Sequence, residues 1–229
     1  MKLNKIIPLP KELISKIFSY DNTYHIINRK NMNSLKDFFE QKKIINEIDF
    51  DQTEYMNLSN LKLNDTGIKL FFNIIKFLNK EIKYLKLVNN NIGIKGIKLI
   101  NNQKSIERLD LTNNNLDDES AILLSKNKNI KWLNLSINNI SCMGAIYLSK
   151  NNYLTHLDLF QNKISEQGIQ ALSENQNIEV LDLQSNLITN NGLIFMEKNI
   201  TLKEFYIDDN NKRLNHDIID KIKVSFNSI

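Results

Sequence analysis

The sequence predicts an α/β solenoid, a right-handed coil in which a parallel, concave sheet carries helices on its convex side, with a small helical module at the N-terminus. Three observations predict it. An 11-residue apolar pattern returns every 24 residues, an asparagine stands near the end of each pattern, and a small residue opens a stretch of helical spacing six residues later. A fixed period of this length is typical of repeat arrays, in which each unit buries its apolar face against its neighbours.

The pattern apolar-x-x-Leu-x-Leu-x-x-Asn-x-apolar predicts a short strand in each unit. An early, degenerate copy begins at Thr53, 29 residues before the first regular one, and the last copy is decayed; the regular series begins at Ile82, Ile106, Ile130, Leu154, Ile178 and Leu202. Side chains alternate along a strand, so Leu109 and Leu111 are expected to point into the core while the residue between them faces outward. Seven such strands would span roughly 29 Å.

The asparagine predicts the turn that follows each strand, because its amide can satisfy backbone groups that the turn leaves unpaired. Leu61 replaces it in the first copy, and the column continues as Asn90, Asn114, Asn138, Asn162, Asn186 and Asn210. A small residue follows six positions later, at Gly67 in the first copy and then at Gly96, Ser120, Gly144, Gly168 and Gly192. It opens a stretch such as GAIYLSKN whose apolar spacing of three and four predicts a helix packed on the strands.

These residues resemble the ribonuclease-inhibitor class of leucine-rich repeats, and within it the short GALA-type repeats of bacterial effector proteins. The likeness rests on the 24-residue period and on the helix start at Gly144, Ala145 and Leu148, and it covers about residues 53–211. It implies a scaffold for protein binding rather than catalysis. We therefore expect leucine-rich repeats over residues 46–213 and a capping helix over 214–229, with Ile218, Ile219, Ile222 and Phe226 on one face.

Residues 1–45 do not match the repeat, and their opening IIPLPKELISKIFSY predicts an amphipathic helix that begins after a proline. It resembles an F-box, the helical module that docks onto the Skp1 adaptor of cullin-RING ubiquitin ligases. The pattern Leu-Pro-x-Glu-Leu-x-x-x-Ile-Phe matches, and the resemblance implies docking through Leu9, Pro10, Leu13, Ile17 and Phe18. Asp21 departs from the usual leucine, and a Trp-containing stretch is missing. The alternative is that residues 1–45 form a helical cap over the first strand.

Composition narrows the classes of partner and compartment. The 30 basic and 26 acidic residues are interspersed, so the net charge of +4 gives no stripe for nucleic-acid phosphates. Apolar runs stay far below the roughly 20 residues of a membrane span, and the N-terminus lacks the apolar core of a secretory signal. A single cysteine, Cys142, fits a reducing compartment. We expect a free monomer in the cytoplasm, or in the host-cell cytoplasm if the protein is an effector.

No pattern for catalysis, metal or cofactor binding is found in the sequence. His25, His156 and His216 match no metal-ligand spacing, and no phosphate loop or nucleophile elbow is present. Cys142 lies between a predicted strand and helix with no base or positive field to form a thiolate. We expect neither enzyme activity nor a cofactor or metal.

The outward strand positions therefore carry the expected function. Large aromatic residues and an arginine stand where solvent should be, with Tyr84, Trp132, His156, Phe160 and Arg108 expected to cluster at mid-array, a composition typical of interface hot spots. Towards the C-terminal end the column turns acidic, which favours a basic partner segment. The expected partner-binding residues are Tyr55, Tyr84, Lys86, Arg108, Asp110, Trp132, Asn134, His156, Asp158, Phe160, Asp182, Glu204 and Tyr206.

Two functions follow from this interpretation. In the first, the protein is a substrate adaptor of a Skp1-cullin-RING ubiquitin ligase that binds a target protein on its concave face. In the second, it is a stand-alone binding module or an effector that sequesters a host protein, without ubiquitin-ligase involvement.

Overall fold

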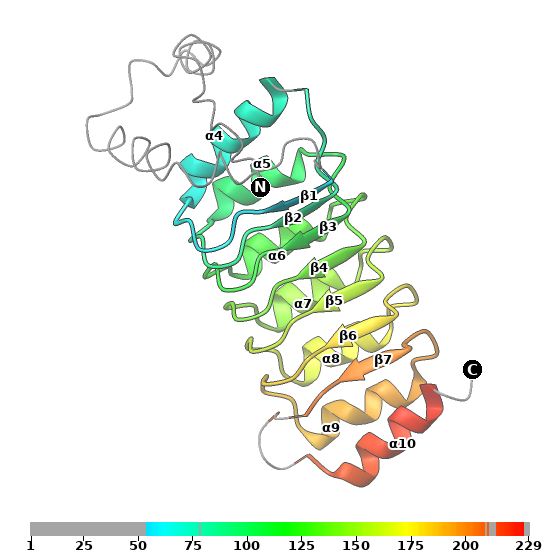
Figure 1. Ribbon diagram of the computed structural model, residues 1–229. Coiled ribbons are helices and arrows are strands. Elements are labelled where there is room, and N and C mark those ends of the chain that lie inside the picture. Colours follow the sequence, from blue (N-terminus) through cyan, green and yellow to red (C-terminus); the bar gives the residue numbers. More distant parts are fainter. Residues whose placement is uncertain (1–53, 78, 209, 211–213, 227–229) are drawn as a thin grey trace, which may run out of the picture.

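A seven-stranded parallel sheet forms the spine of the molecule. The computed structural model describes residues 54–77, 79–208, 210 and 214–226 (Figure 1). The strands follow one another in sequence order across the sheet, each three residues long and in register with the next. They are β1 (Tyr55–Asn57), β2 (Tyr84–Lys86), β3 (Arg108–Asp110), β4 (Trp132–Asn134), β5 (His156–Asp158), β6 (Val180–Asp182) and β7 (Glu204–Tyr206). The predicted α/β solenoid is confirmed, with a strand in each of the seven copies.

One helix follows each strand, and in the described part of the chain the helices cover a single face of the sheet (Figure 1). They are α4 (Asn64–Phe77), α5 (Ile94–Asn101), α6 (Asp118–Leu124), α7 (Cys142–Leu148), α8 (Glu166–Ser173), α9 (Asn190–Leu193), which continues as the 3-10 helix η2 (Ile194–Lys198), and α10 (His216–Phe226). From α5 to α9 the helices begin two residues before the small residue that was expected to open them. Gly144, for example, is the third residue of α7.

At Gly144 a glycine is required by the close approach of the preceding turn and of the neighbouring helix. A Cβ atom added at Gly144 would lie 2.5 Å from Ile140 Cγ2 and 2.7 Å from Asp118 Oδ1, both far below van der Waals separation. Asp118 belongs to the first turn of the preceding helix α6, and its Oδ1 accepts hydrogen bonds from the backbone N–H groups of Ser141 and Gly144. The first turn of α6 therefore contacts the first turn of α7.

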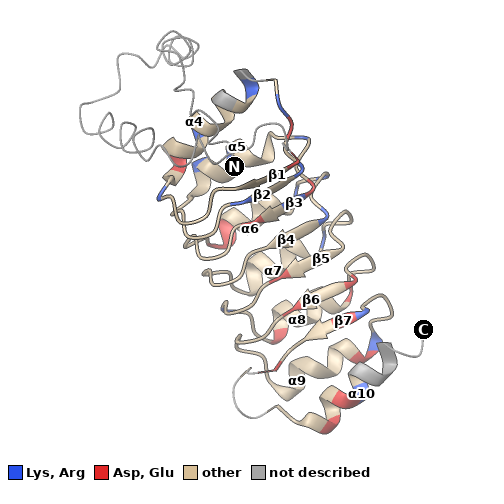
Figure 2. Cartoon of the chain, in the orientation of Figure 1, with Lys and Arg blue, Asp and Glu red and all other residues tan. Residues whose placement is uncertain are grey.

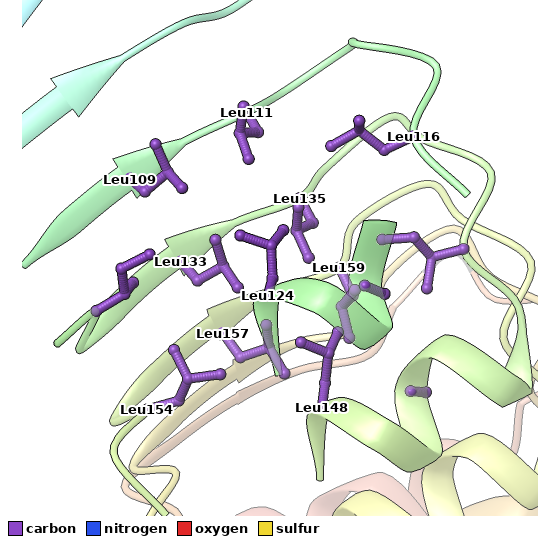
Figure 3. Close-up of a cluster of buried hydrophobic side chains, with 14 of the residues drawn as sticks. Leu109, Leu111, Leu116, Leu124, Leu133, Leu135, Leu148, Leu154, Leu157 and Leu159 are labelled. Atoms are coloured by element: carbon purple, nitrogen blue, oxygen red, sulfur yellow. The ribbon is translucent and has the colours of Figure 1, made fainter. Parts of the chain in front are cut away.

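The core lies between the sheet and the helices, as predicted from the alternation of leucines. Leu109 and Leu111, and the equivalent pair in each following repeat, are fully buried or nearly so. Figure 3 shows Leu133, Leu135, Leu157 and Leu159 pointing from the strands toward Leu124 and Leu148 of the helices, among further leucines of the same layer. Because every repeat adds the same layer, the core is continuous from β1 to β7.

The asparagine column forms a buried hydrogen-bond ladder that joins each repeat to the one before it. Asn114 donates from Nδ2 to the carbonyls of Leu87, Leu111 and Thr112, and its Oδ1 accepts from the N–H groups of Asn90 and Ile92. The contacts to Leu87, Asn90 and Ile92 reach into the preceding repeat. The turn of the first copy, where Leu61 interrupts the column, is held in the same way, since Asn90 accepts from the N–H groups of Leu61 and Leu63.

A second asparagine column, which was not predicted from the sequence, closes the other end of four repeats. It consists of Asn127, Asn151, Asn175 and Asn199, all buried at the same 24-residue period. Asn151 donates to the carbonyls of Ser125 and Asn127 and accepts from the N–H groups of Tyr153 and Leu154. This column stabilises the return from helix to strand.

The last described helix, α10, packs against α9 and η2. Its residues Ile219 and Ile222 are buried in the core cluster, and Ile218 packs partly buried against it. The face expected from the sequence thus covers the final repeat at these three positions. The expected module of residues 1–45 lies outside the described residues.

Candidate binding surface

The surface of the sheet opposite the helices is formed by the outward side chains of β1 to β7, and we call it the open face. Each strand contributes its first and third residues, and the second residue after the strand adds a further side chain. For β4 these are Trp132, Asn134 and Ser136. The register stacks equivalent positions side by side, so that Arg108, Trp132 and His156 are consecutive neighbours across the sheet.

Three aromatic rings meet on the open face, and we call Tyr55, Tyr84 and Trp132 the aromatic cluster. The rings of Tyr55 and Tyr84 are edge-on with centroids 4.9 Å apart, and those of Tyr84 and Trp132 are edge-on at 6.0 Å. Both separations lie in the range of favourable aromatic pairs. Tyr55 is 51% exposed, whereas Tyr84 is half-buried, and burial, followed by the carboxylate of Asp110, raises the pKa of Tyr84.

The position of this cluster differs from the one expected from the sequence. Among the described residues, the ring contacts on the open face join Tyr55 to Tyr84 and Tyr84 to Trp132, and they do not extend to Phe160. The exposed Arg108 lies on β3, between the strands of Tyr84 and Trp132. Phe160 stands four residues after His156 and therefore about 13 Å farther along the strand direction. His156 is a neighbour of Trp132 in register, with Nδ1 2.9 Å from Thr155 Oγ1. The aromatic cluster thus lies in the N-terminal half.

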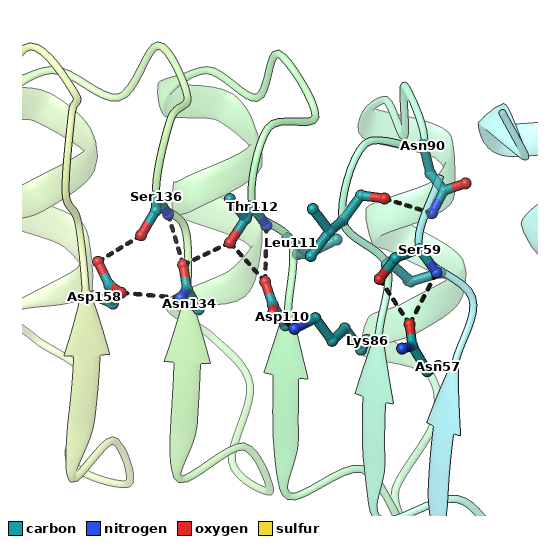
Figure 4. Close-up of polar contacts among 12 residues, drawn as sticks. Asn57, Ser59, Lys86, Asn90, Asp110, Leu111, Thr112, Asn134, Ser136 and Asp158 are labelled. Atoms are coloured by element: carbon teal, nitrogen blue, oxygen red, sulfur yellow. Dashed lines mark hydrogen bonds and ion pairs between the residues drawn. The ribbon is translucent and has the colours of Figure 1, made fainter. Parts of the chain in front are cut away.

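A polar ladder crosses the middle of the open face where the strands end (Figure 4). Asp110 Oδ1 accepts from the N–H of Thr112 at 3.0 Å and from its hydroxyl at 2.7 Å. The same hydroxyl lies 3.0 Å from Asn134 Oδ1, and Asn134 Nδ2 donates to Asp158 Oδ2 at 2.9 Å. Ser136 donates its hydroxyl to Asp158 Oδ1 at 2.5 Å. These bonds hold the side chains of the polar ladder in place.

Asp110 and Asn134 were expected on this surface, but their hydrogen bonds to Thr112 and Ser136 were not predicted. The available signal was an Asp or Asn followed two positions later by Ser or Thr, the spacing of a local side-chain-to-backbone turn. Asp110 was expected to be an exposed binding residue, and its exposure differs from this expectation. It is only 4% exposed, because Thr112 and Lys86, whose Nζ lies 3.5 Å from Asp110 Oδ2, cover its carboxylate.

Towards β7 the open face becomes acidic (Figure 2). Asp158 and Asp182 are register partners on β5 and β6, followed by Glu204 on β7. Burial and the neighbouring charge of Asp158 raise the pKa of Asp182 to about 6, although the N–H of Gln184 opposes this by donating to its carboxylate. Tyr206 donates its hydroxyl to Glu204 at 2.6 Å, and this bond is the main cause that raises the pKa of Tyr206.

Metal-ligating side chains and the cysteine of the described part of the chain were the other candidates for a site. No group of three or more His, Cys, Asp or Glu side chains there could hold a metal ion. Cys142 occupies the helix-start position that Asp118 holds one repeat earlier, and its Sγ accepts from the N–H of Ser165 at 3.2 Å. It therefore joins two repeats. None of the described helices is long and apolar enough to cross a membrane.

The expected Skp1-docking residues Leu9, Pro10, Leu13, Ile17 and Phe18 lie outside the described residues. The remaining expected residues, from Tyr55 to Tyr206, stand on the open face or at its edge, at the positions that the repeat alignment predicts.

Comparison with known proteins agrees with the repeat architecture. A leucine-rich-repeat family model matches residues 102–125, 150–173 and 174–196. No curated protein matches the chain in sequence. Among solved structures, the chain is similar to an internalin from Listeria monocytogenes, with 18% identity and a TM-score of 0.51 over 67% of this chain and 41% of the internalin. It thus spans about two fifths of that protein.

A second solved structure, actin-binding site 2 of leiomodin-1, is similar at 17% identity and a TM-score of 0.36, over 58% of this chain and 69% of that one. The family match thus covers three leucine-rich repeats, and the other strands of the sheet follow the same parallel order.

Proposed function

We propose that this chain, whose leucine-rich repeats form a solenoid, is a protein-binding module and that its partner binds on the open face. The observation that carries the proposal is the aromatic cluster, with its edge-on ring contacts at 4.9 and 6.0 Å on the open face. Aromatic and arginine side chains contribute most to protein interfaces, and here Arg108 stands between Tyr84 and Trp132. An aromatic pair already held in place loses little side-chain freedom on binding.

The ladder below the aromatic cluster supports the same function. Its side chains satisfy one another, so that a partner can cover Asn134 and Asp158 without stripping them of hydrogen bonds. A polar surface prepared in this way lowers the cost of desolvation on binding. The acidic end at Asp158, Asp182 and Glu204 would set the orientation of the bound partner, since it favours a partner that is positively charged at this end.

The experiment compares two aromatic substitutions on opposite faces. Tagged full-length chain is immobilised, and the proteins it retains from a cell extract are quantified for the wild type, Trp132→Ala and Tyr147→Ala. Tyr147 lies in helix α7 and is 36% exposed, so its loss provides a matched control on the helix side. We expect a partner that Tyr147→Ala retains and Trp132→Ala loses by about tenfold or more. A partner that behaves in the opposite way would place the binding surface on the helices.

A finer function, substrate adaptor of a Skp1-cullin-RING ubiquitin ligase, is supported by the F-box-like pattern in the sequence. In that function residues 1–45 bind Skp1 in the cytoplasm while the open face holds the target. Co-purification of the full chain with Skp1, repeated for Leu13→Ala and Phe18→Ala, tests it. We expect the wild type to co-purify and both variants to lose Skp1, and a wild type that does not associate with Skp1 refutes the adaptor function. The stand-alone binding module, including an effector that sequesters a host protein, then becomes the better proposal.

A further inference from the structure

Ile137 adopts a backbone conformation that isoleucine strongly disfavours. It lies in the turn after β4 with φ of 55°, in the left-handed region. Five equivalent residues of other repeats share this conformation, and they are Asn60, Asn89, Asn113, Gln161 and Ser185. Asparagine tolerates the left-handed region because its short polar side chain bonds locally, whereas a β-branched side chain there is a genuine outlier.

The neighbouring asparagines also show what the fold gains from a polar residue at this position. Asn89 Nδ2 donates to Asn60 Oδ1 at 2.7 Å, and Asn113 in turn donates to Asn89. Ile137 follows Asn113 in this column and cannot continue the chain of amide bonds. Its side chain is 36% exposed and does not belong to the buried core. Folding alone therefore favours asparagine at position 137, and a strained, exposed apolar residue points to a role outside folding.

The surroundings of Ile137 define what could bind it. Its backbone N–H donates to the carbonyl of Phe160 at 2.8 Å, which brings the two apolar residues to the same end of the sheet. Asp182 is diagonal to Phe160 across β5 and β6, because its register partner is Asp158, two residues before Phe160. Diagonal positions on neighbouring strands are about 7–8 Å apart, which is close to the spacing of residues i and i+2 on one face of an extended segment.

The two carboxylates at this place are not equivalent. Asp158 accepts from the hydroxyl of Ser136, the amide of Asn134 and the N–H of Phe160, so that both of its oxygens are engaged. Asp182 accepts from the N–H of Gln184 through Oδ1, and it stands partly desolvated beside the charge of Asp158. A cation brought to Asp182 would offset that repulsion.

We propose that Ile137 and Phe160 form a second anchoring point on the open face. It takes an apolar side chain of an extended protein segment, and a lysine or arginine two positions away in that segment pairs with Asp182. This inference rests on the proposed function and specifies the chemistry of the partner. The aromatic cluster and this anchoring point then hold one partner at two places, with the polar ladder between them.

The experiment uses displayed random 12-residue peptides selected against the immobilised full chain. Enriched peptides are synthesised with a fluorescent label and titrated by anisotropy with the wild type, Ile137→Asn, Gln161→Asn and Trp132→Ala. Gln161→Asn is the matched control, because it makes the same change toward asparagine in the same left-handed column without removing an apolar side chain. Urea unfolding of each variant is measured in parallel.

We expect the enriched peptides to share an aliphatic or aromatic residue two positions from a lysine or arginine. Ile137→Asn should raise the urea midpoint and yet raise the dissociation constant of the peptide by about tenfold. Gln161→Asn should leave the dissociation constant within about twofold of the wild-type value. A gain in stability together with a loss of binding separates a contact role from a structural one.

Several results overturn the proposal. Enriched peptides without a basic residue, selection that yields no peptide, or equal affinity for the wild type and Ile137→Asn would each do so. A wild-type chain that is a dimer, and that Ile137→Asn makes monomeric, would replace the partner by a second copy. Peptides that lose affinity with Trp132→Ala alone leave the proposed function standing and refute this inference. Peptides that neither substitution affects count against both.

Discussion

Replacing Asn138 with alanine is expected to destabilise the solenoid far more than most polar substitutions. Its amide oxygen accepts from two buried backbone N–H groups of the preceding repeat, those of Asn114 at 3.1 Å and Leu116 at 2.8 Å. Its Nδ2 donates to three carbonyls, those of Leu111, Leu135 and Ser136. Alanine removes both sets of bonds, but the two sets contribute unequally to the free energy of unfolding.

The three carbonyls keep another donor after the substitution. The amides of Asn114 and Asn162 also donate to Leu111 and Leu135, and the N–H of Asn113 also donates to Ser136. The N–H groups of Asn114 and Leu116, in contrast, lose the acceptor described for them. A buried donor without a partner costs about 1–3 kcal/mol, so the two together cost about 4 kcal/mol.

Equilibrium unfolding in urea, followed by circular dichroism, measures this loss. At an m value of about 3 kcal/mol per molar urea, the midpoint should fall by roughly 1.3 M. The control is Asn139→Ala, the same substitution at the next residue, where the amide makes one exposed bond to Asn115 Oδ1 at 2.6 Å. It should cost under about 1 kcal/mol. Equal losses for the two variants would refute the view that the buried column holds the repeats together.

Two further substitutions test the packing and the charge of the fold. Gly144→Ala should lower the free energy of unfolding by about 1–2 kcal/mol, because the new methyl group meets Ile140 and Asp118 below 3 Å. Gly67→Ala is the control, because its methyl group meets only the Leu63 side chain, at 3.0 Å and beyond. Thermal unfolding measures both variants and should change little for Gly67→Ala. Asp182→Asn should stabilise the chain by about 1 kcal/mol at pH 8 but not at pH 4, a value discounted for the solvent that reaches this half-buried carboxylate. The folded-state pKa of about 6 lies above the ordinary 3.8, so the cost of ionisation grows as pH rises through this interval. Urea midpoints at both pH values measure it, and an equal gain at pH 4 would contradict the assigned cause.

The repeat unit was predictable from the sequence because its determinants are local and periodic. Alternation places Leu109 and Leu111 in the core, and the 24-residue period then sets the register of every strand pair. The second asparagine column had the same period at Asn127 and Asn151 and was equally available. It was missed because it lies beyond the helix, outside the pattern that defined the repeat.

The surface was less predictable because burial there depends on lateral neighbours. Asp110 occupies an outward strand position, and only the side chains of Lys86 and Thr112 decide that its carboxylate is covered. The aromatic cluster depends likewise on how Tyr84 and Trp132 lean toward each other across Arg108. A column of aligned residues predicts the order of side chains across the sheet but not their rotamers. The sequence therefore predicted which residues lie on the open face, but not which of their side chains contact one another.

Adjacent residues in one turn illustrate how folding and binding are divided in this molecule. Asn138 places its amide inside, where it serves the backbone of the preceding repeat. Ile137, one residue earlier, contributes its N–H to the carbonyl of Phe160 and leaves its side chain exposed. The backbone of the turn is thus fixed by the position that faces inward, which frees the neighbouring position to carry an unfavourable residue. Substitutions at the two positions should therefore shift stability in opposite directions, because one removes the support of the turn and the other removes its strain.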